Sequence, residues 1–143
     1  MTRILGLDVG NKTIGVALSD PLGFTAQGIT TINRSHDLKQ DFIKLKEICD
    51  NYKVELIVIG LPKHMNGSIG TQAKLVKNFV IELQNNINLP IEYIDERLTT
   101  VLAQKSLIEG NIKKSKRKQI IDKQAAVFIL QTYLDKQYNK YNK

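Results

Sequence analysis

Near its start the chain reads Ile4-Leu5-Gly6-Leu7-Asp8-Val9-Gly10, and a second apolar run, Ile14-Gly15-Val16-Ala17-Leu18, follows at once. Two short runs with a few polar residues between them predict a β-hairpin that starts a sheet. Asp8 closes the first run, where a carboxylate is costly unless a metal, a cation or a hydrogen-bond donor compensates it. Gly10 follows where the backbone must turn tightly or approach a ligand closely. We expect an acid fixed at the rim of a sheet, unless Asp8 only starts the turn before Asn11.

The composition predicts one folded domain over residues 1–143. The hydrophobic fraction is 42% and there are three prolines, which fits a chain with one hydrophobic core. Residues 1–4 have no signal-peptide pattern, and no stretch approaches the ~20 apolar residues of a membrane span. The single cysteine, Cys49, is expected in the core and supports neither a disulfide framework nor a zinc site. We therefore expect a cytoplasmic protein that does not enter a membrane.

The net charge of +7 comes from the C-terminal part of the chain. Residues 1–104 hold 11 basic and 11 acidic side chains, whereas residues 105–143 hold 10 basic and 3 acidic ones. Five of those ten lie in Lys113-Lys114-Ser115-Lys116-Arg117-Lys118. Such a cluster on an otherwise neutral chain is typical of a surface that binds nucleic-acid phosphates. A solvated loop has the same composition, and this alternative stays open.

Apolar periodicity predicts strands and helices in a definite order. Strands are expected over 4–8, 14–18 and 26–32 as antiparallel hairpins, and later over 54–60 and 90–95. Four helices are expected. The first follows a cap at Ser35 or Asp37 and turns Leu38, Phe42, Leu45 and Cys49 inward, and the second turns inward Ala73, Val76, Phe79, Val80, Leu83 and Ile87. The third runs from Val101 to about Gly110, and the last, after the basic loop, from about Asp122 to Tyr138. Strands that alternate with helices need parallel crossovers, so the fold class is α/β with a mixed five-stranded sheet.

Three acidic positions could converge in such a sheet. Asp8 ends the first strand, the Asp95-Glu96 pair ends the last strand, and Asp122 opens the final helix. Parallel strands bring their carboxyl ends to one edge, so Asp8 can meet Asp95 or Glu96 there. Asp122 precedes the apolar stripe of the helix by three and four residues, which turns it toward the sheet. It could instead be only the N-cap of that helix.

Converging carboxylates repel one another unless cations lie between them, and hard oxygen ligands suit Mg²⁺ or Mn²⁺. Two such ions about 3.5–4 Å apart can activate a water and stabilise the leaving oxygen of a phosphodiester. The basic cluster would then bind the polyanion that is cut. His36, near a helix start, and His64, in a glycine-bearing loop, fit no ligand role, although His64 could approach a phosphate.

Several segments resemble the YqgF family, also called RuvX-like, a branch of the ribonuclease-H-like nuclease fold. The matching segments are Leu7–Ala17, Gly60-Leu61-Pro62 with Asn66-Gly67-Ser68, Asp95-Glu96-Arg97-Leu98-Thr99-Thr100, and Ile121–Ala126. Asp-Glu-Arg-Leu-Thr-Thr is the most specific of these. The resemblance covers almost the whole chain, and it implies a mixed five-stranded sheet with flanking helices.

The resemblance further implies a metal-dependent nuclease that processes the 5′ end of the precursor of small-subunit (16S) ribosomal RNA, or a resolvase of branched DNA. By position, Asp8, Asp95-Glu96 and Asp122 match the acidic residues of the family, and Glu96 is preferred over Asp95 as the inward ligand. Arg97 could clamp a phosphate or pair with a carboxylate. Lys12 could meet substrate or point to water, and Thr13 stands where the family pattern has a basic residue. The oligomeric state, monomer or homodimer, stays open.

Two other classes compete with a nuclease. An actin-like or sugar-kinase-like ATP-binding protein also opens with an Asp-x-Gly turn, but its members need two lobes, and 143 residues supply one. A non-catalytic nucleic-acid-binding module would keep the fold and lose the acids, yet none of the expected acids is missing. The nuclease is therefore the favoured hypothesis.

Overall fold

The computed structural model describes residues 2–35, 37–61, 71–95 and 114–141, with the backbone alone described at residues 71, 114–122 and 141. Along the chain these residues form β1 (Arg3–Val9), β2 (Thr13–Ser19), β3 (Ala26–Asn33), α1 (Leu38–Tyr52), β4 (Val54–Leu61), α2 (Thr71–Asn86), β5 (Ile91–Asp95) and α4 (Lys114–Tyr141). All five predicted strands are confirmed. The predicted helix from Val101 to Gly110 lies outside the described residues.

The strands form one mixed sheet in the order β3-β2-β1-β4-β5. β1 pairs antiparallel with β2, and β2 with β3, whereas β4 pairs in parallel with both β1 and β5. This arrangement confirms the predicted sheet. The last residues of β1, β4 and β5 consequently lie along one side of the sheet, which we call the carboxyl edge.

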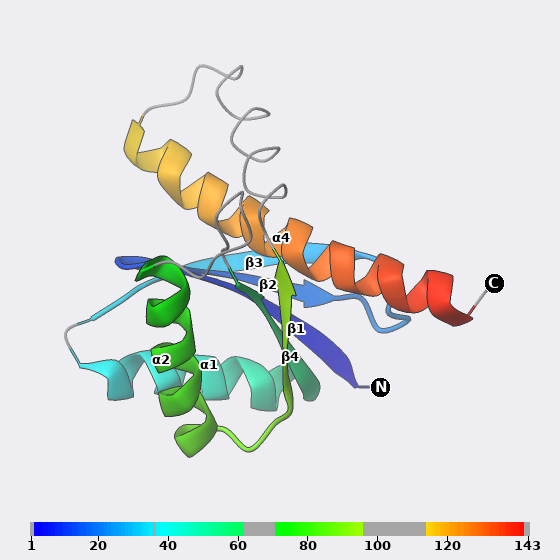
Figure 1. Ribbon diagram of the computed structural model, residues 1–143, viewed down its shortest axis with the longest axis horizontal. Coiled ribbons are helices and arrows are strands. Elements are labelled where there is room, and N and C mark those ends of the chain that lie inside the picture. Colours follow the sequence, from blue (N-terminus) through cyan, green and yellow to red (C-terminus); the bar gives the residue numbers. More distant parts are fainter. Residues whose placement is uncertain (1, 36, 62–70, 96–113, 142–143) are drawn as a thin grey trace.

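Helices cover both faces of the sheet (Figure 1), with α4 on one face and α1 and α2 on the other. Alternate strand residues point to opposite faces, so each strand contributes to two cores. The core under α1 and α2 takes Leu5, Leu7, Val9, Ile57 and Ile59, while the core under α4 takes Ala17, Val58 and Ile94. We call these two sides the α1/α2 face and the α4 face.

Helix α1 begins and ends at residues that satisfy its free backbone groups. The Asp37 Oδ1 atom accepts a hydrogen bond from the Lys39 amide at 3.0 Å, which confirms Asp37 as the cap. Lys53 adopts a left-handed conformation, with φ at 54°, and its amide bonds to the Cys49 carbonyl. Cys49 is buried as predicted, whereas Leu38, predicted to point inward, is 39% exposed at the first helical residue.

Helix α2 buries every residue of its predicted apolar face. Ala73, Val76, Phe79, Val80, Leu83 and Ile87 all belong to the core under α1 and α2. The helix itself ends at Asn86, but the amide of Ile87 still donates to the Leu83 carbonyl at 2.8 Å. The core side of α2 was therefore predictable from spacing alone.

Helix α4 is longer than the sequence predicted, and two expectations fail on it. The helix begins at Lys114, so residues 114–118 are helical and do not form a loop. Lysine, arginine and glutamine are good helix formers, and no glycine or proline interrupts this segment. Asp122 thus lies inside the helix and is not its N-cap. The predicted stripe of Ala125, Ala126, Ile129, Leu130 and Tyr133 is buried as expected.

Candidate active site at the carboxyl edge

Asp8 is the next-to-last residue of β1 and is half-buried. Its partner on β2 is Gly15. On the other side Leu7 pairs with Ile59, so the residue of β4 beside Asp8 is Gly60. Neither neighbour carries a side chain, and the carboxylate is therefore not flanked by apolar atoms on the adjoining strands. This surrounding fits an ionised carboxylate better than a buried apolar row would.

Asp8 lies on the same face as Gly6, because the two residues are separated by one position of the strand. A Cβ atom built on Gly6 would lie 2.7 Å from Leu130 Cβ and 3.2 Å from the Ala126 carbonyl oxygen. The missing side chain lets α4 pack directly against the β1 backbone. Asp8 therefore faces the side of the sheet that α4 crosses.

The direction of α4 over the sheet follows from its contacts with β3. The Ala26 amide donates to Gln131 Oε1 at 2.9 Å, and two residues further along β3 a Cβ on Gly28 would lie 2.6 Å from Lys123 Cγ. Helix α4 therefore runs in the direction opposite to β3, so that the last residues of β3 lie nearest to the start of α4. β1 runs in the same direction as β3, since each pairs antiparallel with β2.

The same relation places the α4 backbone near Asp8. Gly6 lies beside Ala126, and Asp8 is two strand residues further on, about 6.6 Å along β1. One turn back along α4 from Ala126, about 5.4 Å of helix axis, is Asp122. The backbone of Asp122 therefore lies close to the level of Asp8. The Asp122 side chain lies outside the described residues.

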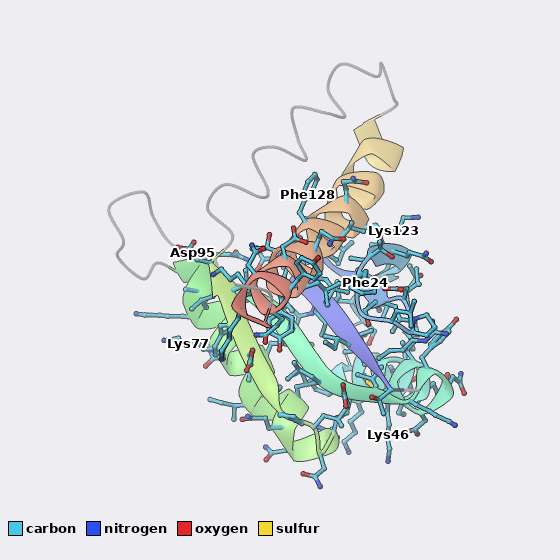
Figure 2. The ribbon with its side chains drawn as sticks, turned by 90° about the vertical axis from the view of Figure 1, so that its right-hand side faces the viewer. Phe24, Lys46, Lys77, Asp95, Lys123 and Phe128 are labelled. Atoms are coloured by element: carbon cyan, nitrogen blue, oxygen red, sulfur yellow. The ribbon has the colours of Figure 1, made fainter. Side chains whose placement is uncertain are left out.

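Asp95 is the last residue of β5, is exposed, and pairs with Leu61. Its neighbour Ile94 belongs to the core under α4. Strand alternation therefore turns Asp95 toward the α1/α2 face, the same side as Leu61 and opposite to Asp8. Figure 2 shows Asp95 on β5 and Lys123 over β3, at the two flanks of the sheet. Glu96 lies outside the described residues.

The structure describes some of the basic residues that were predicted to bind nucleic acid, in the β1–β2 turn and at the start of α4. Lys12 is exposed in the turn between β1 and β2. Lys114, Lys116, Arg117 and Lys118 lie in the first turns of α4, where only the backbone is described. Arg97, Lys113, His36 and His64 lie outside the described residues.

Three features near Asp8 were not predicted. The Gln72 side chain at the start of α2 donates to the Val9 carbonyl at 3.4 Å, which ties that helix end to the carboxyl edge. Arg34 Nη1 donates to the Gly10 carbonyl at 2.8 Å. The third is Gly60 beside Asp8, and its signal in the sequence was a glycine that closes an apolar strand. No sequence pattern indicated the two side-chain contacts, because their partners are distant in the chain.

Within the described residues no three His, Cys, Asp or Glu side chains gather closely enough to hold a metal ion. The side chains of Glu96 and Asp122, two of the predicted ligands, are not among them. The donor chemistry at Asp8 nevertheless fits a hard cation, because a carboxylate supplies hard oxygen ligands and the paired residue on β2 is a glycine. In the same part of the chain no helix is long and apolar enough to cross a membrane.

Solved structures with this fold include two resolvases. One is Thermus thermophilus RuvC in complex with a Holliday junction substrate, with a TM-score of 0.60, 11% identity and coverage of 97% of both chains. The other is the fowlpox virus Holliday junction resolvase, with a TM-score of 0.55 and 13% identity over 94% of this chain and 99% of that one. At such low identity these similarities support the ribonuclease-H-like fold and nothing finer.

Sequence relatives are much closer. A Clostridium kluyveri protein named "Putative pre-16S rRNA nuclease" is 60% identical over 134 residues, which cover 94% of this chain and 97% of the relative. A protein of the same name from Clostridium tetani is 56% identical over 138 residues, which cover 96% and 99%. The family model described as "RuvX: Holliday junction resolvase" matches residues 2–136. The predicted resemblance is thus confirmed, and the chain belongs to the RuvX family.

Proposed function

We propose that this chain is a metal-dependent nuclease that hydrolyses phosphodiester bonds in the precursor of 16S ribosomal RNA, at its 5′ end. The observation that carries the proposal is the position of Asp8, a half-buried carboxylate between two glycines at the carboxyl edge and on the α4 face. Relatives named as nucleases of this precursor, 56–60% identical over nearly the whole chain, support the choice of substrate. We expect the protein to act in the cytoplasm, where such precursors are made.

Asp8, Glu96 and Asp122 are the residues that would hold Mg²⁺ or Mn²⁺. The register of β5 argues against Asp95, because Ile94 packs under α4 and the next residue of the strand faces the opposite side, so we assign the ligand role to Glu96. The direction of α4 supports Asp122, whose backbone lies one turn from the Ala126–Gly6 contact. A pair of divalent ions, when bound there, would supply activation of a water and stabilisation of the leaving oxygen.

The remaining residues would bind and orient the RNA. Lys12 follows Asp8 in the exposed turn, where it can meet a phosphate beside the cut. Residues 114–118 carry four positive charges on about 7.5 Å of helix axis, a density that attracts a polyanion. We assign the same binding role to Lys113, which precedes the helix, and to Arg97, which follows Glu96.

A resolvase activity on branched DNA is the second candidate, and the family description "Holliday junction resolvase" favours it. A four-way junction has two-fold symmetry, so this substrate would require a symmetric dimer. An RNA-trimming nuclease has no such requirement. The oligomeric state in solution therefore bears on the choice between the two substrates.

Cleavage by the purified protein tests the proposal directly. A labelled precursor that spans the mature 5′ end and a labelled four-way DNA junction are incubated with Mg²⁺ or Mn²⁺ and the wild type, Asp8→Asn or Asp20→Asn. Asp20 is a matched control, because it is an acid in the β2–β3 turn. RNA cleavage that only Asp8→Asn abolishes is the expected result. Junction cleavage alone would replace the substrate, and binding without cleavage of either would indicate a non-catalytic module.

A further inference from the structure

We propose that Arg34 is a positioning residue that holds the β1–β2 turn, and through it Asp8, in place for catalysis. This inference rests on the proposed nuclease function. The turn consists of Gly10, Asn11 and Lys12 and begins two residues after Asp8. Arg34 follows the last residue of β3 and is half-buried.

Arg34 bonds to both ends of this turn. Its Nη1 atom donates to the Gly10 carbonyl at 2.8 Å, and its backbone amide donates to the Lys12 carbonyl at 2.8 Å. Within the turn itself, the Gly10 amide donates to the Thr13 carbonyl at 2.9 Å. Arg34, which directly follows β3, therefore supplies two of these three bonds, and it fixes the segment directly after Asp8.

The Arg34 guanidinium is in turn held by the helices of the opposite face. It lies over the Phe79 ring of α2, 5.3 Å from the ring centroid. Phe79 is 4% exposed and packs against Phe42 of α1 at 5.2 Å between centroids. A guanidinium that stacks on a fixed ring keeps its donors in a defined direction. The turn thus takes its position from the rigid core under α1 and α2.

Asp41 anchors the residue that follows Arg34. Its side chain is fully buried in the first turn of α1, and its Oδ1 atom accepts from the Ser35 amide at 3.1 Å. Its Oδ2 atom has no hydrogen-bond partner within the described part of the chain. A buried carboxylate with an unsatisfied oxygen lowers stability, so its presence is better explained by the segment it positions than by the energy it adds.

Arg3 provides a matched control at the other end of β1. Its guanidinium lies over the Tyr52 ring at 5.5 Å, and its backbone amide donates to the Lys53 carbonyl at 3.1 Å. The two arginines therefore share the same kind of ring contact and the same kind of backbone bond. Of these two arginines, only Arg34 bonds to the turn beside Asp8.

The test compares Arg34→Ala, Arg34→Lys and Arg3→Ala. On the RNA precursor we expect Arg34→Ala to lower kcat by about 10–100-fold, the usual cost of losing a residue that orients a ligand, with KM changed less than about twofold. Arg34→Lys keeps a donor and a charge and recovers part of the loss, while Arg3→Ala retains the wild-type kcat. A raised KM with unchanged kcat would overturn the proposal, because Arg34 would then bind substrate directly.

Two further measurements need no turnover. In metal-free protein, hydrogen exchange of residues 9–13 should speed up by roughly tenfold or more in Arg34→Ala and stay unchanged in Arg3→Ala, because an opened turn exposes its amides. Mn²⁺ titration should give an affinity lowered by about 10–100-fold in Arg34→Ala alone. Unchanged exchange and unchanged Mn²⁺ affinity would overturn the positioning role. If hydrogen exchange is faster in Arg34→Ala but the wild type cleaves no nucleic acid, the proposed function is wrong and the role of Arg34 in holding the turn remains supported.

Discussion

The two faces of the sheet use the same strands in opposite ways. Toward the α1/α2 face, β1 and β4 present large aliphatic side chains up to the carboxyl edge, ending in Val9 and Leu61. Toward the α4 face the side chains of β4 shrink in that direction, as Leu56, Val58 and Gly60, and β1 has Ile4, Gly6 and then the carboxylate of Asp8. One face therefore supplies most of the stable core. The other lets a helix approach the backbone and leaves a carboxylate among small residues.

The largest expected effect separates two acids that are neighbours in sequence, Asp95, the last residue of β5, and Glu96. Glu96→Gln should lower cleavage by more than about 100-fold, since a direct ligand matters more than the 10–100-fold typical of an outer one. Asp95→Asn should leave kcat nearly unchanged, because register turns Asp95 to the α1/α2 face. Single-turnover cleavage of the precursor measures both. The reverse order would mean that β5 presents Asp95 to the site.

The α1/α2 face should respond to truncation with a loss of stability and no loss of chemistry. Leu45→Ala removes a fully buried side chain of α1 and should lower the free energy of unfolding by about 2–5 kcal/mol. Urea denaturation measures this change. At a temperature where the variant is folded, kcat should equal that of the wild type. A reduced kcat in the folded variant would show that this face also shapes the site.

Gly6→Ala should damage stability and activity together. The added Cβ would meet Leu130 Cβ at 2.7 Å, so α4 must shift, at a cost of about 1–3 kcal/mol. The shift also moves Asp122 relative to Asp8 and should lower kcat. Gly23→Ala is the control, because Gly23 has φ at +77° with no atom within 4 Å and lies in the β2–β3 turn. Gly23→Ala should lower the free energy of unfolding by about 1–2 kcal/mol and leave kcat unchanged.

Charge removal should have the smallest effect on chemistry and should act on binding. Replacing Lys114, Lys116, Arg117 and Lys118 by glutamine should lower the slope of log affinity against log salt by about 0.7 for each phosphate of single-stranded RNA that the protein no longer neutralises. Four exposed lysines on the α1/α2 face, Lys39, Lys44, Lys46 and Lys77, form the control set (Lys46 and Lys77 in Figure 2). Equal slopes for the two variants would mean that the basic segment of α4 does not bind the RNA backbone specifically.

Much of the fold was predictable because the signals are local. The alternation of Leu5, Leu7 and Val9, the Asp37 cap and the six-residue face of α2 each depend on neighbours in sequence. The prediction of where α4 begins was wrong, because a run of lysines is typical of a solvated loop and also has good helix propensity. The helix begins at Lys114, and the burial of its apolar stripe begins at Ala125.

The candidate site was predictable only as a set of residue types. Parallel strands put Asp8 and Asp95 at one edge, but the face that each of these two acids occupies depends on register, which the close approach of Gly6 to Leu130 and the burial of Ile94 fix. Arg34 was not predictable. Its ring contact is with Phe79, on an element far away in the chain, and no local pattern encodes that distance.

The α4 face of the carboxyl edge should hold a divalent-metal site with Asp8 as a ligand. Calorimetry measures this as Mn²⁺ binding to the wild type, to Asp8→Asn and to Asp20→Asn. We expect the wild type and Asp20→Asn to bind Mn²⁺ equally, and Asp8→Asn to bind it more than about 100-fold more weakly. Equal binding by all three proteins would contradict the account.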